Sequence, residues 1–337
     1  MKLKQVIRLA HGNGGKLTQE LIRNVFFPCF NNSFLAPLSD SAVFKLNGTE
    51  VAFTTDSYVI KPIFFPGGDI GKLSVSGTVN DLAVMGAKPL FISCSLIIEE
   101  GLPLSTLKKI IWSIQETAIK SGVKVITGDT KVVEKGSGDS IFINTAGIGV
   151  VSSEIKLGFD RIEVGDRIII SGTIGGLSIA VLSQREELGF GESVSSDCAP
   201  LYELVEKLKP YWKDIKFMRD PTRGGIAGIL NEIVQGRNFG IELWEREIPL
   251  KEETMAICEL LGIDPLYLAN EGKIIFFVNE KNANEIVEVL RNHPLGEKAN
   301  VVGEVVAGPP GKVYLETIIG TKRVLDMLVE DQLPRIC

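Results

Sequence analysis

Cysteine is scarce in this sequence, and its cysteines are scattered. Five occur among 337 residues, none forms a close pair, and their spacing matches no zinc-binding pattern. An odd, unpaired set argues against both a disulfide framework and a structural zinc site. We therefore expect a protein of the reducing cytoplasm. The cysteines are Cys29, Cys94, Cys198, Cys258 and Cys337.

Long apolar runs and an excess of basic residues are also missing. No run approaches the roughly 18 residues that a membrane span needs, and Met1 to Gln5 contain no apolar signal region. The 36 basic and 42 acidic residues give a net charge of -6 and an isoelectric point near 5.3. This balance argues against a surface for nucleic-acid phosphates. We expect a soluble protein that binds neither membrane nor nucleic acid.

The hydrophobic content is sufficient for two domains. It amounts to 45% of the residues, ample for a core in each half of a chain of this length. The apolar pattern pauses between Lys156 and Asp166, where we place the boundary. Beyond it, strand and helix patterns alternate, which indicates α/β or α+β organisation. The predicted division is residues 1–155, residues 156–329 and a mobile tail at residues 330–337.

A glycine loop opens the first amphipathic segment. The stretch from His11 to Gly15 contains three glycines, and apolar residues at helical spacing follow it from Leu17 to Phe26. A loop of this kind can wrap a phosphate or simply form a turn. It lacks the lysine-serine pair of a Walker loop, so both readings stay open.

Several acids stand where apolar runs end. Asp40 and Asp56 each follow such a run, and Asp129 follows the apolar stretch from Val123 to Thr127. A strand that is buried along its length can leave a carboxylate exposed at its end. Asp129 emerges together with Lys131, so one could bind magnesium while the other meets phosphate or substrate. Acids at strand ends are also common turn formers, and the pair could be a surface ion pair.

A polar pair interrupts an otherwise apolar helix. The spacing predicts a helix from Lys72 to Met85, stopped by the glycine and proline that follow. Asn80 and Asp81 lie inside it, and buried polar groups need partners. Asp81 therefore either ligates a metal ion or accepts a hydrogen bond from a neighbouring backbone.

Two polar spots stand out in the second half. Asp220 and Pro221 read as the N-cap and first residue of a helix, which leaves Arg223 without a structural explanation. Glu271 stands just before a strongly apolar run. A carboxylate at the mouth of a buried strand can have a raised pKa suited to proton transfer, although a turn acid is the commoner case.

The last residue, Cys337, carries a thiol and a carboxylate together. Pro334 blocks continuation of a helix, so the segment is predicted to leave the domain as an extended arm. The alternative is a frayed tail with an incidental cysteine. A carrier thiol becomes the better reading only when the order of the preceding motifs is considered.

Taken in order, the motifs resemble those of the aminoimidazole ribonucleotide synthetase superfamily of ATP-dependent enzymes. Within it, four stretches are similar to the HypE family of nickel-iron hydrogenase maturation proteins. The resemblance covers essentially the whole chain; the sequence around Asp40 departs from it by carrying one acid where many relatives have two. The four stretches are residues Phe64–Gly71, Gly77–Gly86, Ala269–Gly272 and Pro334–Cys337.

The resemblance implies a two-domain α+β fold with an N-terminal domain of mixed sheet that binds ATP and dimerises, and a C-terminal α/β domain. It implies ATP-dependent dehydration of a carboxamide on Cys337 to an S-cyanide, with Mg²⁺ as the cofactor. Lys131 and Glu271 would orient and deprotonate the carboxamide, or Lys131 would bind the transferred phosphoryl group. The implied metal ligands are Asp40, Asp56, Asp81 and Asp129. The implied ATP-binding residues are these four with Asn80, Thr130, Asp220 and Arg223.

The same resemblance implies a homodimer and two transient partners. A HypF-type carbamoyltransferase would load Cys337, and a HypC-HypD scaffold would receive the cyanide. A selenophosphate synthetase would carry a reactive cysteine near the first glycine loop, where this chain has none. A different class of function also fits: a nucleotide-binding scaffold whose tail is only a docking peptide.

Overall fold

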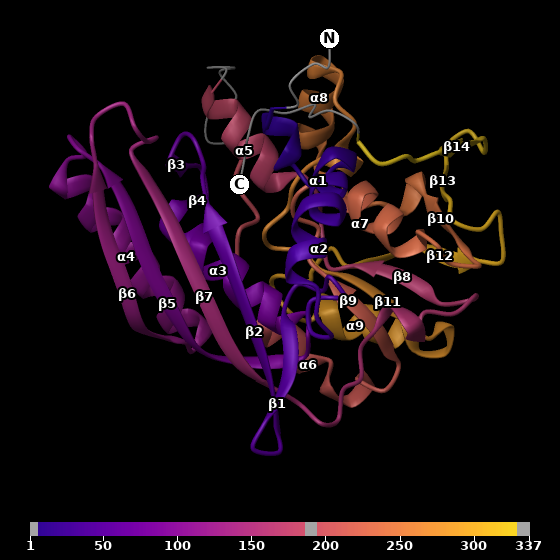
Figure 1. The fold of residues 1–337 in the computed structure, drawn as a ribbon. Helices are drawn as coiled ribbons and strands as arrows, with labels where there is room; N and C mark the ends of the chain where they lie inside the picture. Colours follow the sequence, from indigo (N-terminus) through magenta and orange to yellow (C-terminus); the bar gives the residue numbers. More distant parts are fainter. Residues whose placement is uncertain (1–5, 186–193, 329–337) are drawn as a thin grey trace, which may run out of the picture.

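A computed structural model describes residues 6–185 and 194–328 of the chain (Figure 1). The predicted tail and its Cys337 lie outside the described residues. Among the residues that are described, no helix has the length and apolar character required to cross a bilayer.

The N-terminal half is built on a five-stranded mixed sheet. The strand order is β1-β2-β7-β5-β6, in which only β5 and β6 are parallel. Helices α3 (Ile70–Ala83) and α4 (Leu104–Ser121) lie side by side on one face of it (Figure 1). This is the mixed sheet expected from the sequence. The strands are β1 (Ala42–Leu46), β2 (Thr49–Tyr58), β5 (Ala87–Glu99), β6 (Lys124–Val133) and β7 (Ile141–Val151), and a small hairpin joins β3 (Phe64–Phe65) to β4 (Gly68–Asp69).

Helix α3 is the buried rod of this half. The Asp69 carboxylate accepts hydrogen bonds from the N–H groups of Gly71 and Lys72, at 2.7 and 3.2 Å, and so begins the helix. Nearly every later residue of α3 is buried. Gly86, with φ at 69°, turns the chain away just past its end. The predicted helix is confirmed, with both ends about two residues earlier than expected.

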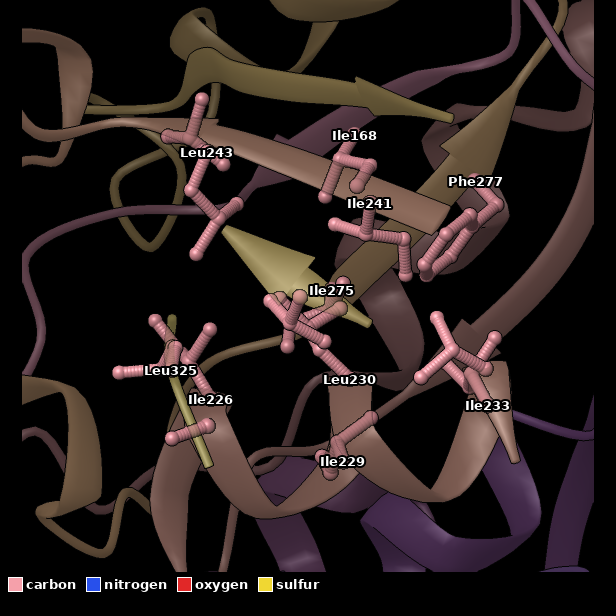
Figure 2. Packing of buried hydrophobic residues seen from close by; sticks show 14 of the residues in the cluster. Ile168, Ile226, Ile229, Leu230, Ile233, Ile241, Leu243, Ile275, Phe277 and Leu325 are labelled. Atoms are coloured by element: carbon pink, nitrogen blue, oxygen red, sulfur yellow. The ribbon is translucent and has the colours of Figure 1, made fainter. Parts of the chain in front are cut away.

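The C-terminal half contains a seven-stranded sheet with helices on both faces. Its order is β14-β13-β10-β12-β8-β11-β9, and all neighbours are antiparallel except β10 and β13. Helix α7 packs its apolar face on one side of this sheet (Figure 2), and α6 and α9 cover the other. The strands are β8 (Arg167–Ile170), β9 (Ile215–Arg219), β10 (Gly240–Trp244), β11 (Ile275–Val278), β12 (Asn300–Val306), β13 (Val313–Glu316) and β14 (Lys322–Val324); the helices are α5 (Gly176–Arg185), α6 (Tyr202–Lys207), α7 (Gly225–Val234), α8 (Glu252–Leu261) and α9 (Ala283–Arg291).

The first helices of the chain lie against the C-terminal half. Helix α1 (Lys16–Leu21) is joined by a π-helical turn to α2 (Phe27–Phe30), and α1 lies beside α7 (Figure 1). The Gln19 side-chain amide donates to Glu232 of α7 at 2.7 Å. The boundary between residues 155 and 156 stays a prediction. The segment that contains α1 belongs to the predicted N-terminal domain in sequence but packs on the C-terminal half.

Asn80 ties the two halves together. Its side chain is fully buried, and its amide nitrogen donates to the carbonyls of Glu271 and Ala199, at 2.9 and 3.2 Å. Its amide oxygen accepts from the N–H of Leu201 at 2.8 Å. A buried polar side chain was expected to need hydrogen-bond partners, and for Asn80 these are main-chain groups of the C-terminal half.

We expect Asn80→Ala to reduce the free energy of unfolding by about 3 kcal/mol, because it leaves several buried main-chain groups without partners. Chemical denaturation measures the loss. Asn292→Ala is the control, since Asn292 is exposed and makes one side-chain bond, to the Glu288 carbonyl; its effect should stay within about 0.5 kcal/mol. Equal losses for the two variants would contradict the role of Asn80 as a tie.

Candidate active site

Three carboxylates from both halves converge where the halves meet. One oxygen from each of Asp40, Asp81 and Asp220 lies within 4.8 Å of the others. Asp40 stands two residues before β1, Asp81 lies on α3, and Asp220 directly follows β9. Oxygen ligands from three separate elements can surround a hard divalent cation. We refer to these three residues as the acid cluster.

The place of Asp220 corrects the sequence-based reading of it. The helix expected from Ile226 to Val234 is found as α7 (Gly225–Val234), but its N-cap residue is Gly224, with φ at 76°, and not Asp220. The wrong prediction arose because Asp-Pro is a common helix start, whereas here the chain first makes a turn. Asp220 is 3% exposed, and its Oδ2 atom has no hydrogen-bond partner among the described residues. A buried, unpaired carboxylate oxygen indicates that a ligand is needed.

Arg219 supplies a positive charge beside the cluster, and sequence reasoning missed it. Its Nε lies 2.9 Å from Asp40 Oδ1, and its Nη1 lies 2.9 Å from Glu232 Oε2. The arginine side chain is itself largely buried. The sequence did contain a signal for Arg219. Arg219 and Asp220 are adjacent at the end of an apolar strand, and successive side chains of a strand point in opposite directions, so the two charges need separate partners.

Burial raises the pKa of every acid in the cluster. Loss of water is the main cause for Asp40, Asp81 and Asp220. The negative charge of Asp40 raises the pKa of Asp81 and Asp220 further, and the charges of Glu232 and Asp56 do so for Asp40. The pKa of Asp81 and Asp220 lies well above the ordinary carboxyl range. A hydrogen bond of 2.6 Å from the Thr54 hydroxyl to Asp81 Oδ2 opposes the shift. Without a cation, these acids therefore take up protons at a higher pH than exposed carboxylates do.

Asp56 lies close enough to the cluster to raise the pKa of its acids. It belongs to β2, two residues before the strand ends. Burial raises the pKa of Asp56, and the positive charge of Arg223 acts in the opposite direction. Arg223 also donates from Nη1 to the Gly12 carbonyl at 3.2 Å. Arg223 thus lies between the acids and the glycine loop.

Glu271 lies where the two halves of the chain meet, at the contact between α3 and the segment before β11, which we call the seam. It is 3% exposed, and its pKa is raised well above the usual value by burial first and then by the charges of Asp220 and Asp56. The side-chain amide of Asn80 lies 3.5 Å from Glu271 Oε1. Helix α3 comes so near that a Cβ on Gly77 would lie 3.0 Å from the same oxygen. The raised pKa considered from the sequence is found here, while proton transfer by Glu271 stays a prediction.

Asp129, Thr130 and Lys131 lie apart from the acid cluster within one chain. Strand β6 does not end before them but continues through Val133, because the sheet edge pairs with β5 along this stretch. Three strand spacings, about 14 Å, separate β6 from β2. Lys131 Nζ lies 2.8 Å from Asp129 Oδ2, both side chains being exposed, and this pairing lowers the pKa of Asp129.

Comparison with known families accounts for both halves of this arrangement. The family of the AIR synthase related protein matches by its N-terminal domain over residues 38–151 and by its C-terminal domain over residues 163–316. Carbamoyl dehydratase HypE of Escherichia coli K12 is 44% identical over 336 residues, covering 98% of this chain and 99% of the relative. The chain belongs to the HypE family.

Other members support the same placement. Carbamoyl dehydratase HypE of Bradyrhizobium diazoefficiens is 46% identical over 332 residues, covering 98% of this chain and 96% of the relative. Among solved structures, a chain from the crystal structure of a HypE-HypF complex matches with a TM-score of 0.86 and 47% identity. The match covers 91% of this chain and 99% of that one. A HypE structure in complex with ATP matches with a TM-score of 0.82, at 44% identity, over 98% of this chain and 100% of that one.

The described residues bring together part of the predicted HypE site. Asp40, Asp56, Asp81 and Asp220 gather at the seam, with Asn80, Glu271 and Arg223 around them. The β6 residues Asp129, Thr130 and Lys131 remain on the outer strand, and Cys337 lies outside the described residues. The roles predicted for all of these residues stay predictions.

We expect Asp220→Asn to stabilise the metal-free protein at pH 7.5 by about 1 to 3 kcal/mol, because the buried aspartate must either hold a charge or take up a proton on folding, and an amide does neither. The pH dependence has a definite sign. Asp81 and Asp220 have folded pKa values above their unfolded values of about 4. Their contribution is therefore most favourable at low pH and is lost as pH rises from about 4 through the folded pKa.

Chemical denaturation in EDTA between pH 5 and 8 tests this expectation, and Asp220→Asn should show the flatter profile. Asp160→Asn serves as the control because Asp160 is exposed. If Asp220→Asn instead lowers the free energy of unfolding in EDTA, the Asp220 carboxylate stabilises the metal-free protein, and the expectation that it is destabilising is wrong.

Proposed function

We propose that this chain is an ATP-dependent carbamoyl dehydratase that converts an S-carboxamide on Cys337 into an S-cyanide. The product would supply the cyanide ligand of the iron in nickel-iron hydrogenase during its maturation. One observation carries the proposal: in a member of the HypE family, an acid cluster with an unpaired, buried Asp220 oxygen lies beside the buried Glu271. The cluster suits a cation that holds nucleotide phosphates, and Glu271 suits proton transfer.

The chemistry explains why a dehydratase would need ATP. The oxygen of an amide is a very poor leaving group. Transfer of the ATP γ-phosphoryl group to that oxygen converts it into phosphate, which leaves readily. Two N–H protons are lost, the carbon-oxygen bond breaks, and the carbon-nitrogen triple bond forms. The carboxamide oxygen ends in inorganic phosphate, so one water is removed overall while ATP becomes ADP.

The acid cluster fits Mg²⁺ by its donor chemistry. Mg²⁺ binds carboxylate oxygens, usually one or two from the protein together with water and phosphate. Asp40 has Arg219 as a counter-charge and Asp81 has the Thr54 hydroxyl, whereas the Oδ2 of Asp220 has no partner among the described residues. We infer that Asp81 and Asp220 are the most available ligands, with Asp40 and Asp56 close by. A bound magnesium ion would neutralise charge on the phosphates during transfer.

Glu271 is the proposed base for the carboxamide protons. Its raised pKa brings proton uptake closer to neutral pH than for an exposed glutamate. Asn80 fixes its main chain through the 2.9 Å hydrogen bond to its carbonyl. Burial at the seam would keep water from the activated carboxamide. Lys131 is proposed either to orient the carboxamide or to bind the transferred phosphoryl group.

We propose that a second copy of the chain completes the site. Strand β6 forms one edge of its sheet, and Val125, Ile126 and Val132 on it are exposed. Exposed apolar residues on a sheet edge favour burial by a partner. A homodimer through this strand would give Asp129, Thr130 and Lys131 a place in the ATP site that one described chain does not provide.

The remaining partners follow from the reaction. A HypF-type carbamoyltransferase would deliver the carbamoyl group to Cys337, consistent with the solved complex of a related HypE with HypF. A HypC-HypD scaffold would receive the cyanide. We propose that the exchange takes place in the cytoplasm, where the cysteines stay reduced.

Cys337→Ala tests the carrier role directly. Protein is mixed with a HypF-type carbamoyltransferase and its carbamoyl donor, and intact mass and C-terminal peptides are recorded before and after MgATP. Wild type should gain one carbamoyl group on Cys337 and then lose one water, and Cys337→Ala should gain none. Cys29→Ala is the matched control, because it removes the thiol of an exposed cysteine in α2 and leaves Cys337 in place. If wild-type Cys337 stays unmodified although ATP binds, the tail is a docking peptide and the carrier role fails.

Val132→Asp tests the dimer. Val132 is 67% exposed on β6, so the substitution should leave folding intact while placing a charge in the proposed interface. Light scattering should report a monomer, and ATP affinity should fall by at least about tenfold if the second copy completes the site. Ile319→Asp, at an 83% exposed position in the C-terminal half, should stay dimeric. A dimeric Val132→Asp protein with normal ATP affinity would exclude this interface.

A further inference from the structure

The glycine loop near the start of the chain contacts the last described residues. The N–H of Lys16, the first residue of α1, donates to the Leu328 carbonyl at 2.8 Å. Gly15 packs on the same group, since a Cβ at that position would lie 2.6 Å from the Leu328 oxygen. Leu328 precedes Cys337 by nine positions in the sequence. The glycine loop thus meets the chain where the thiol-bearing tail begins.

Further contacts fix the chain just before Leu328. Leu325 is fully buried in the core beside Ile226 of α7 (Figure 2), and its carbonyl accepts from the Asn231 side chain at 2.8 Å. The Asp326 carbonyl accepts from the Tyr267 hydroxyl at 2.7 Å. All of these contacts come from the C-terminal half. The Lys16 bond is the last one along the described chain, and it alone comes from the N-terminal segment.

The glycine loop is itself held against the site. Gly14 has φ at 79°, and a Cβ there would lie 2.8 Å from the Arg223 carbonyl, so the loop packs directly on the Arg223 turn. The Arg223 side chain donates to Gly12 and faces the charge of Asp56. The loop therefore lies between the start of the tail and the acids. Within the described residues, the buried Asn13 Nδ2 has no partner, which leaves the loop able to hold one further acceptor.

We propose that the glycine loop fixes the origin of the catalytic tail and thereby positions Cys337 for the reaction at Glu271, an inference that rests on the proposed function. Nine residues span at most about 30 Å. Fixing their origin beside Arg223 limits the volume that the thiol can search and raises its effective concentration at the site. Lys16 acts through its main-chain N–H and is a positioning residue.

Lys16→Pro removes that N–H while suiting the helix. Proline is favoured at the first position of a helix, where its missing N–H is otherwise unused within the helix. The extended conformation of Gly15 is one that a following proline accepts. The proline ring would also occupy the place of the Leu328 carbonyl. Lys16→Ala is the matched control, because it loses the same side chain and keeps the N–H.

The assay is a single turnover of protein already carbamoylated on Cys337, followed by intact mass after MgATP. Lys16→Pro should lose water about 10- to 100-fold more slowly than Lys16→Ala, as expected for a misplaced reactive group. ATP affinity and the rate of carbamoylation should agree between the two within about twofold, because both depend on other contacts. Amide exchange of the peptide that begins at Leu325 should be faster in Lys16→Pro.

Gly15→Ala gives a second, independent perturbation. Its backbone conformation is open to alanine, but the added Cβ would displace Leu328. Gly12→Ala in the same loop meets only the Leu9 carbonyl, at 3.6 Å, and is its control. Equal dehydration rates within each pair, or unchanged amide exchange, would overturn the proposal. If no protein, wild type included, loses water, the proposed function fails, and amide exchange alone then decides whether the loop anchors the tail.

Discussion

Repulsion between carboxylates that the fold brings together is the constraint on which the rest of the structure depends. Asp40, Asp81 and Asp220 belong to separate elements, and each loses water on burial. Their proximity is maintained by groups that attach those elements to the frame: Arg219 for Asp40, Thr54 for Asp81 and, across the seam, Asn80. A fold that holds like charges in this way has a site prepared for a cation before the cation arrives.

Much of this arrangement could be predicted from local sequence. The helix that carries Asp81 was predictable because glycine and proline stop it and its apolar residues leave no alternative to burial. The resemblance to the HypE family and the two-domain fold followed from the order of several motifs. Glu271 could be singled out because it stands just before a strongly apolar run, and its burial agrees with that position.

Other features depend on contacts between distant residues, which local patterns do not encode. Asp220 satisfied the rule for a helix start, yet the turn after β9 delays α7 and frees its carboxylate. In the sequence, Arg219 is only a charged residue at the end of a strand. In the structure it forms ion pairs with both Asp40 and Glu232. The acids Asp40 and Asp129 had similar local settings, but the order of the strands places one near the seam and the other on an outer edge.

The packing of α1 on the C-terminal half has a consequence for the order in which the protein is assembled. Gln19 and Glu232 are separated by 213 positions, and the carbonyl that Lys16 binds belongs to Leu328. A ribosome completes the N-terminal sheet long before it makes these partners. The earliest segment synthesised must therefore wait, without its final contacts, until nearly the whole chain has emerged. The Lys16 N–H can therefore reach the Leu328 carbonyl only after residues up to Leu328 have been synthesised, so local sequence alone cannot fix the conformation of the glycine loop.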